Sequence, residues 1–278
     1  MGIKTILTFC DTSPQTEVRL KIATELASGF GAHLIGTFVR GQIVVPAYME
    51  AGVGVDLIML QEKRLDELQS KGKALFDKVT GPSGLNCEWR ATRGDIYEQA
   101  TMHARYADLI VTGQYDPKLR DPDVVSDLAE MIALQAGRPV LVVPYIGVKQ
   151  PVGQHILVAW NASREATRAV KDSLPFLKAA KQVTVLAIDP RGGAEGHGEQ
   201  PGADIAGYLA RHGVKVTASQ TASDKVDPAD VLLSRAADLN VDLIVMGAYG
   251  HSRLREMVLG GATRKVMQSM TVPVLVSH

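Results

Sequence analysis

Residues 241–247 read Val241-Asp-Leu-Ile-Val-Met-Gly247, and the same pattern occurs 134 residues earlier as Ala107-Asp-Leu-Ile-Val-Thr-Gly113. Each segment is a short apolar run that follows an aspartate and ends at a glycine. A run of this length without polar alternation predicts a strand that is buried on both faces, as in a parallel sheet covered by helices. The duplication predicts that the chain builds such a sheet twice.

Two further pairs of segments extend the repeat. Thr5-Ile-Leu-Thr-Phe-Cys-Asp-Thr-Ser13 matches His155-Ile-Leu-Val-Ala-Trp-Asn-Ala-Ser163 at a distance of 150 residues, and Arg138-Pro-Val-Leu-Val-Val143 matches Val272-Pro-Val-Leu-Val-Ser277 at 134. The first half therefore holds 16 extra residues between its first and fourth predicted strands. Residues 41–56 have no evident counterpart, and we expect an additional loop or hairpin there.

Strand and helix patterns alternate within each half, which is typical of a parallel sheet with crossover helices. Ser163 is expected to cap the first helix of the second half, and Asp227-Pro228 to open a later one. The sequence predicts two tandem doubly wound Rossmann-like domains, each a five-stranded parallel sheet with helices on both faces. In the second half the expected strands are His155–Trp160, Gln182–Ile188, Val214–Thr221, Asp242–Gly247 and Val272–Ser277.

The seam between the halves is expected near residue 150, where Gly147, Pro151 and Gly153 interrupt the periodicity. We therefore predict domains at residues 1–146 and 153–278. A second irregular stretch, residues 190–202, is expected to be a surface loop.

Composition limits the classes of function. Thirty basic and thirty acidic residues leave a net charge of zero, so no overall field favours nucleic acid or an anionic membrane. The two cysteines, Cys10 and Cys87, show no metal or disulfide spacing. The N-terminus has no typical secretory signal, and apolar runs stay at strand length. We expect a soluble, cytoplasmic protein without a disulfide.

A glycine-rich segment follows the predicted fourth strand of the second half. It reads Gly247-Ala-Tyr-Gly250, nine residues, and then Gly260-Gly261-Ala-Thr263 at the start of a helix. Glycines allow main-chain N–H groups to approach a phosphate chain, and the positive end of a helix favours its charge. Each glycine alone is better explained as a turn or a packing point, but the spacing favours nucleotide binding.

The spacing resembles the G-x2-G-x9-G-(S/T) loop of the universal stress proteins, and the two-fold repeat resembles the tandem form of that family. The resemblance implies binding of ATP, or of AMP or ADP, with Mg²⁺ as a candidate companion of the phosphates. It also implies that the halves pair through their last strands about an approximate two-fold axis. The resemblance is also compatible with a homodimer and with an unidentified protein partner.

The resemblance also implies a set of binding residues in the second half. Asn161 stands where the family usually has an aspartate near adenine and ribose, and Gly261 stands where it has serine or threonine. Ser163 is the other polar residue of that strand end, although a helix cap explains it better. The contacts implied by the resemblance are Asn161, Ile188, Gly247, Gly250, Gly260, Gly261 and Thr263. Ser163, His251 and Arg253 are added as candidate contacts, although a solvated loop explains His251 and Arg253 equally well.

The first half serves as an internal control for the loop. Gly250, Gly260 and Gly261 are replaced there by Asp116, Ser126 and Asp127. Residues 250–265 carry a net charge of +3 and residues 116–131 a net charge of −3. The first loop would repel a polyphosphate that the second attracts, so we predict a single site, in the second half.

No catalytic residue and no metal ligand is predicted, because no Walker-type loop, nucleophile elbow or His/Cys cluster occurs. At most we expect slow ATP hydrolysis. The leading hypothesis is a nucleotide-dependent stress-response or signalling module in which ATP orders residues 248–259. The alternatives are a structural pseudo-dimer that acts through protein contacts alone and an enzyme acting on an adenylated or flavin ligand.

Overall fold

The computed structural model describes residues 2–11, 13–41, 55–119, 124–148, 151–190, 200–250 and 261–278. In the described part of the first half, five strands alternate with four helices and a short 3-10 turn. These elements are β1 (Thr5–Phe9), α1 (Thr16–Phe30), β2 (His33–Arg40), α2 (Val55–Thr80), η2 (Gly81–Ser83), β3 (Cys87–Arg93), α3 (Ile96–Ala104), β4 (Leu109–Gly113), α4 (Leu128–Gln135) and β5 (Val140–Val143).

The second half repeats this order of strands and helices. Its elements are β6 (His155–Ala159), α5 (Arg164–Ala179), β7 (Gln182–Ile188), α6 (Ala203–Arg211), β8 (Val216–Thr221), α7 (Pro228–Asp238), β9 (Leu243–Gly247), α8 (Gly261–Ser269) and β10 (Val274–Ser277). The predicted strands of this half are therefore confirmed to within two residues at each end.

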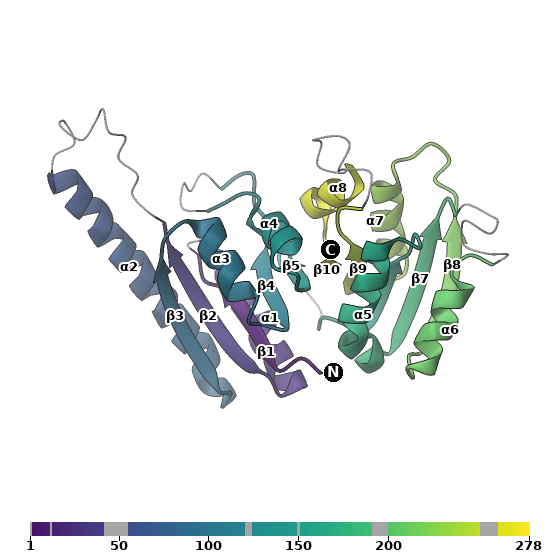
Figure 1. Cartoon of the computed structure of the whole chain (residues 1–278), viewed down its shortest axis with the longest axis horizontal. Helices are drawn as coiled ribbons and strands as arrows, with labels where there is room; N and C mark the ends of the chain where they lie inside the picture. Colours follow the sequence, from purple (N-terminus) through teal and green to yellow (C-terminus); the bar gives the residue numbers. More distant parts are fainter. Residues whose placement is uncertain are drawn as a thin grey trace.

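All ten strands form one sheet in the order β3-β2-β1-β4-β5-β10-β9-β6-β7-β8 (Figure 1). Neighbouring strands are parallel within each half. The two halves meet through β5 and β10, which are antiparallel and aligned with Val142 opposite Val274 and Val140 opposite Val276. The predicted fold class, two doubly wound α/β domains in tandem, is confirmed, and so is pairing through the last strands.

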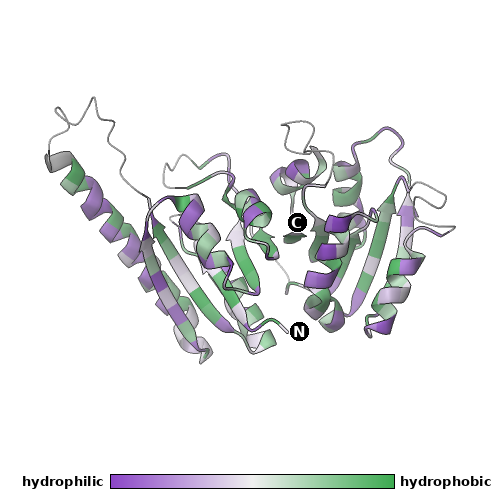
Figure 2. Ribbon diagram, in the orientation of Figure 1, coloured by the Kyte–Doolittle hydropathy of each residue, from purple (hydrophilic) through white to green (hydrophobic). Residues whose placement is uncertain are grey.

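Both faces of the sheet are covered, which explains why the strands are apolar throughout. Ile6 and Leu7 are neighbours in β1 and point to opposite faces, where each joins a different buried cluster. One cluster includes α1, α2, α5 and α6, and the other α3, α4, α7 and α8. Figure 2 shows the apolar strands between helices whose outer surfaces are hydrophilic. Burial of this aliphatic surface is the main force that holds the layers together.

An aspartate directly precedes the fourth strand of each half and binds the main chain at the start of the first strand. Asp108 Oδ2 accepts hydrogen bonds from the main-chain N–H groups of Lys4 (2.8 Å) and Thr5 (3.0 Å). Asp242 accepts from Gly153 (2.8 Å), Gln154 (3.0 Å) and His155 (3.0 Å). The repeated aspartate is thus a structural anchor for the neighbouring strand.

The extra length of the first half lies at least in part in a helix. Helix α2 has 26 residues, whereas its counterpart α6 has nine. Val55 and Asp56, which we had placed in a loop or hairpin, belong to α2. The rest of that predicted loop, residues 42–54, lies outside the described residues, as does most of the second predicted loop, residues 191–199.

The two halves also touch away from the sheet. The Gln114 side chain donates to the carbonyls of Met267 (2.9 Å) and Gln268 (3.0 Å) at the end of α8. On the other face, the rings of Phe30 and Phe176 meet edge to face with centroids 5.0 Å apart. The cysteines of the chain, Cys10 and Cys87, are both free. Within the described ranges, no helix is both long and apolar enough to span a membrane.

Candidate functional site

The predicted nucleotide corner lies where the strand order of the second half reverses. Strands β6 and β9 are adjacent and parallel, with Ala159 opposite Met246, so the loops that follow them begin side by side. Ligands of open α/β sheets bind outside the carboxyl ends of strands at such a reversal. The topology therefore brings Asn161 and Gly247 to one edge of the sheet.

The polar side chains after β6 shape the start of helix α5. Asn161 Oδ1 accepts a hydrogen bond from the Ser163 amide at 3.1 Å, and Ser163 Oγ accepts one from the Ala166 amide at 3.1 Å. Ala162 between them has a φ of 57°. Ser163 therefore caps the N-terminus of α5, as predicted. The Asn161 side chain remains exposed at the edge of the corner.

Gly247 has a packing function that is sufficient to explain it. A Cβ atom at this position would lie 2.5 Å from the Ala166 nitrogen and 2.6 Å from the Glu165 carbonyl carbon. Only glycine lets α5 begin this close to the end of β9. A Cβ on Gly250 would lie 3.3 Å from Glu165 Oε2, so the same helix start also lies close to Gly250.

Glu165 is a residue of this corner that the sequence did not single out as a site residue. It is 5% exposed, and its Oε2 atom has no hydrogen-bond partner among the described residues. In the sequence it has the ordinary signal of an acidic residue in the first turn of a helix. Its burial beside Gly247 and Gly250 depends on tertiary packing that no local pattern reveals.

Helix α8 begins at Gly261, and a Cβ atom there would meet no atom of the described part of the chain within 4 Å. Thr263 is buried, and its Oγ1 accepts a long hydrogen bond of 3.5 Å from the Tyr249 amide. The Thr263 hydroxyl thus binds the loop after β9. His251, Arg253 and Gly260, the other predicted contacts on this loop, lie outside the described residues.

Ile188 ends β7, one strand beyond β6, and is half buried. The next residue, Asp189, has a φ of 46°, and its carboxylate accepts from the Ser223 amide at 2.8 Å. The structure therefore places Ile188 at the edge of the same corner, while Asn161, Ser163, Gly247 and Gly250 gather around the start of α5.

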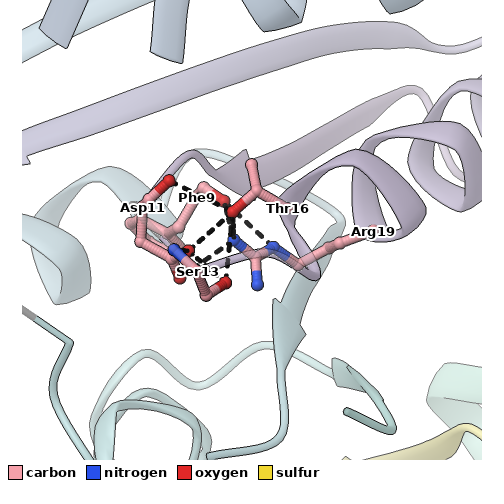
Figure 3. Close-up of polar contacts among 5 residues, drawn as sticks. All are labelled: Phe9, Asp11, Ser13, Thr16 and Arg19. Carbon is pink, nitrogen blue, oxygen red and sulfur yellow. Dashed lines mark hydrogen bonds and ion pairs between the residues drawn. The ribbon is translucent and has the colours of Figure 1, made fainter. Parts of the chain in front are cut away.

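The equivalent corner of the first half contains a closed polar network (Figure 3). Asp11 Oδ1 accepts hydrogen bonds from Ser13 Oγ (2.5 Å), the Ser13 amide (2.9 Å) and Thr16 Oγ1 (2.6 Å). Its Oδ2 pairs with Arg19 Nη2 at 2.9 Å. Arg19 also donates from Nε (3.0 Å) and Nη2 (2.8 Å) to the Phe9 carbonyl at the end of β1. The charged side chain of Arg19 therefore points from helix α1 into the protein interior.

Arg19 is 2% exposed, so its charge depends on these partners. Burial acts against the charge of Asp11, but the Arg19 guanidinium and the Ser13 and Thr16 donors outweigh it and hold the pKa of Asp11 below its usual range. The position equivalent to Arg19 in the second half is Ala169. The two corners therefore differ in chemistry although the strands that form them correspond.

The helix that corresponds to α8 begins differently. Asp127 precedes α4, and its Oδ1 accepts a hydrogen bond of 2.6 Å from the Tyr97 hydroxyl. This hydrogen bond, together with burial, raises the pKa of Tyr97 to about 12. A carboxylate thus stands at the helix start where the second half has the bare Gly261.

A cavity of about 420 Å³ lies in this first half. It opens at the carboxyl ends of β1, β2 and β4, and residues of α2 and α4 contribute to its walls. We had predicted a nucleotide site only in the second half and had made no prediction about a cavity in the first half. Its walls come from α2 and from the segment before α4, which had no recognisable motif.

Comparisons with known proteins agree on one family. The family model described as the universal stress protein family matches residues 153–278. The universal stress protein YxiE of Bacillus subtilis is 46% identical over 50 residues, 18% of this chain and 34% of that protein. The universal stress protein MJ0577 of Methanocaldococcus jannaschii is 39% identical over 49 residues, 18% of this chain and 30% of that protein. The matches thus span only 13–34% of the curated relatives' lengths.

The fold of the whole chain is also found in a solved structure. A universal stress protein from Archaeoglobus fulgidus superimposes with a TM-score of 0.74, covering 98% of this chain and 97% of that chain at 16% identity. At this identity the likeness shows the shared fold. Taken together, the comparisons show that residues 153–278 match the universal stress protein family, and that the whole chain has a two-domain, tandem architecture whose fold is shared with a universal stress protein.

Proposed function

We propose that the second half of the chain binds ATP, or AMP or ADP, at the carboxyl ends of β6 and β9. The observation that carries the proposal is the start of α8 at Gly261, where no atom of the described residues lies within 4 Å of the position of a Cβ. The main-chain N–H groups of a first helical turn have no partner within the helix and attract anions. Phosphate oxygens would take this place.

The charges around the loop support the same proposal. Residues 250–265 carry a net charge of +3, although Lys265 is paired with Asp227 (3.3 Å) and Asp230 (2.6 Å). The corresponding residues of the first half carry −3, and Asp127 stands at the start of α4. A polyphosphate is therefore favoured in one half and disfavoured in the other.

Within this proposal, Asn161 would lie beside adenine and ribose, Ile188 would border adenine, and Gly261 would face the phosphates. Mg²⁺ would shield the phosphates if it accompanies the nucleotide. Loop residues His251, Arg253 and Gly260 complete the proposed contacts. Hydrolysis, if any, would be slow. Binding of ATP would act as a signal to a partner protein.

Gly261→Asp is the variant that tests the proposal. It copies Asp127 of the first half into the second and places a carboxylate where the phosphates would bind. We expect ATP affinity to fall at least tenfold, or about 1.4 kcal/mol. The matched control, Asp127→Gly, changes the equivalent residue of the first half and should leave ATP affinity unchanged. Equal affinity of the wild type and Gly261→Asp in equilibrium dialysis would overturn the proposal.

A structural pseudo-dimer without a ligand is the second candidate function. It is favoured by the continuous sheet through β5 and β10 and by the Gln114 and Phe30 contacts between the halves. Nucleotide released from the purified protein by heat denaturation would decide between the two. Adenine nucleotide near one equivalent per chain favours the first, and its absence favours the second.

A further inference from the structure

The cavity of the first half lies where ligands of α/β sheets bind. Strand order reverses between β1 and β4, and the cavity lies at the carboxyl ends of these strands and of β2. Its volume of about 420 Å³ is within the usual range of about 300–1,000 Å³ for small-molecule sites. Its lining combines charged, polar and apolar side chains, so we expect an occupant that has both a polar and an apolar part.

The Arg19 guanidinium lines this cavity and has hydrogen-bond donors that its partners do not use. Nε and Nη2 donate to the Phe9 carbonyl, and Nη2 also contacts Thr16 Oγ1 (3.0 Å) and Asp11 Oδ2 (2.9 Å). Nη1 has no hydrogen-bond partner among the described residues, and Figure 3 shows it on the side of the guanidinium that carries no dashed contact. Two of the five N–H donors of an arginine are on this atom.

The position of Nη1 directs these two donors toward the cavity. Nη1 occupies the place of a Cβ on Gly113, and Gly113 itself lines the cavity without a side chain that could cover the donors. Arg19 is only 2% exposed, so bulk water does not satisfy them. A buried polar group without a partner is rare in proteins and indicates an acceptor that binds there.

The charges on the lining allow one further negative charge but not several. Arg19 and Arg64 of α2 are the positive residues of the lining, and Asp11 and Asp116 are the negative ones. Asp11 is already paired with Arg19, and Asp116 accepts a hydrogen bond of 2.9 Å from the Lys118 amide. A polyphosphate would add several negative charges, whereas a monoanion adds only one.

Apolar side chains form the rest of the walls. They include Leu65 and Leu68 of α2, Val39 at the end of β2, and Val125 and Leu128 near α4, all of which are only partly buried. Helix α2, which supplies two of these leucines, has 26 residues, whereas its counterpart α6 has nine. The extra length of the first half therefore contributes to the cavity.

We infer that the first half binds a small organic monocarboxylate whose carboxylate accepts hydrogen bonds from Arg19 Nη1 and whose apolar body lies against α2 and the start of α4. Carboxylates form strong, charge-assisted hydrogen bonds with a guanidinium, and the fork of donors allows Arg19 to bind Asp11 on one side and the ligand on the other. Arg64 adds positive charge to the same lining. The inference does not depend on nucleotide binding in the second half.

Isothermal titration of the full chain with three matched probes tests the chemical class. Octanoate is the probe acid, octanamide has the same chain without the charge, and octylamine has the opposite charge. We expect one octanoate site per chain, binding of octanamide that is about tenfold weaker, and no binding of octylamine. Excess ATP should not displace octanoate. Equal affinities for octanoate and octanamide would overturn the inference, and so would displacement of octanoate by ATP.

Two arginine variants locate the carboxylate. Arg64→Gln removes a charge from an exposed residue of the lining and should weaken octanoate binding about threefold. The matched control Lys63→Gln removes the same charge from the neighbouring exposed residue, which does not line the cavity, and should leave binding unchanged. Arg19→Lys keeps the charge beside Asp11 but removes Nη1 and should weaken binding about tenfold. Undiminished binding by folded Arg19→Lys, as judged by circular dichroism, would contradict the inference.

A wall variant decides the question even if Arg19→Lys does not fold. Leu68→Asp puts a carboxylate on the cavity wall and should weaken octanoate binding about tenfold or more. The control Leu60→Asp changes a residue of the same helix that is 64% exposed and should bind octanoate as the wild type does. Equal effects of the two substitutions would place octanoate outside the cavity and overturn the inference.

Discussion

The guanidinium of Arg19 occupies the space that a side chain on Gly113 would fill, because Arg19 Nη1 would overlap with a Cβ atom at that position. The glycine at the end of β4 is therefore required by a buried arginine of α1. The equivalent glycine, Gly247, makes room for the backbone at the start of α5 instead. Glycine is therefore required at this repeated position in both halves, but for a different physical reason in each.

Gly113→Ala should destabilise the protein by about 1–3 kcal/mol, because Arg19 must shift within a closely packed site. Gly29→Ala is the control, since a Cβ on that exposed helical glycine meets nothing within 4 Å. It should stabilise the protein by about 0.5–1 kcal/mol. Urea unfolding of both variants measures the difference, and a neutral Gly113→Ala would show that Arg19 is not held in place.

Gly247→Ala should cost more than Gly113→Ala, about 3 kcal/mol or more, because the added atom meets main chain of α5 rather than the end of a side chain. The same urea titrations give this value. If Gly247→Ala were the milder of the two substitutions, the close contact between β9 and α5 would be contradicted.

Asp11→Asn should lower the free energy of unfolding at pH 7 by about 1–3 kcal/mol, because Arg19 loses its charged partner. The pKa of Asp11 is depressed in the folded protein, so the stability it provides is present above the ordinary aspartate pKa of about 3.9 and is lost as pH falls through the lower folded value.

Urea unfolding at pH 7, 5 and 3 tests this pH dependence. The gap between the wild type and Asp11→Asn should be full at pH 7 and 5 and should narrow at pH 3. Glu17→Gln, which changes a partly exposed carboxylate on the same helix, should show little difference at pH 7. A gap that is independent of pH would contradict the ion pair.

Asp242→Ala should destabilise the protein by about 2–3 kcal/mol, because three main-chain N–H groups, including the buried one of Gly153, lose their acceptor. Asp108→Ala removes the acceptor of two N–H groups and should cost less. Thermal unfolding of the two variants provides the comparison, and equal losses would argue against the anchoring role.

The sequence predicted the strands and their order of alternation, because buried parallel strands and helix caps have local signatures. The pairing of the halves was predicted only from the family resemblance. The predictions failed where a residue's environment depends on distant elements. Arg19 has the pattern of a surface residue on an amphipathic helix, yet Phe9, Asp11 and Gly113 enclose it. The inward orientation of Arg19 depends on its packing against the ends of β1 and β4, which no local pattern reveals.

The candidate sites also combine features that the sequence predicted with features that depend on tertiary packing. The repeat comparison identified the opposite charges of residues 250–265 and 116–131. The structure adds that a Cβ on Gly261 would contact none of the described residues, whereas Asp127 accepts a hydrogen bond from the Tyr97 hydroxyl. The cavity of the first half is lined by Asp11, Ser13 and Gly113, which the repeat aligns with Asn161, Ser163 and Gly247. Its remaining walls could not be predicted, because Leu65 and Val125 come from separate elements and form no motif. Glu165 was likewise visible only as a first-turn acidic residue.

Isothermal titration of the full chain with ATP and Mg²⁺ tests the central claim most directly, because it counts the sites. We predict one site per chain, located in the second half and weakened at least tenfold by Gly261→Asp. Two sites per chain would contradict the predicted difference between the halves, and no binding at saturating ATP would contradict the proposed function itself.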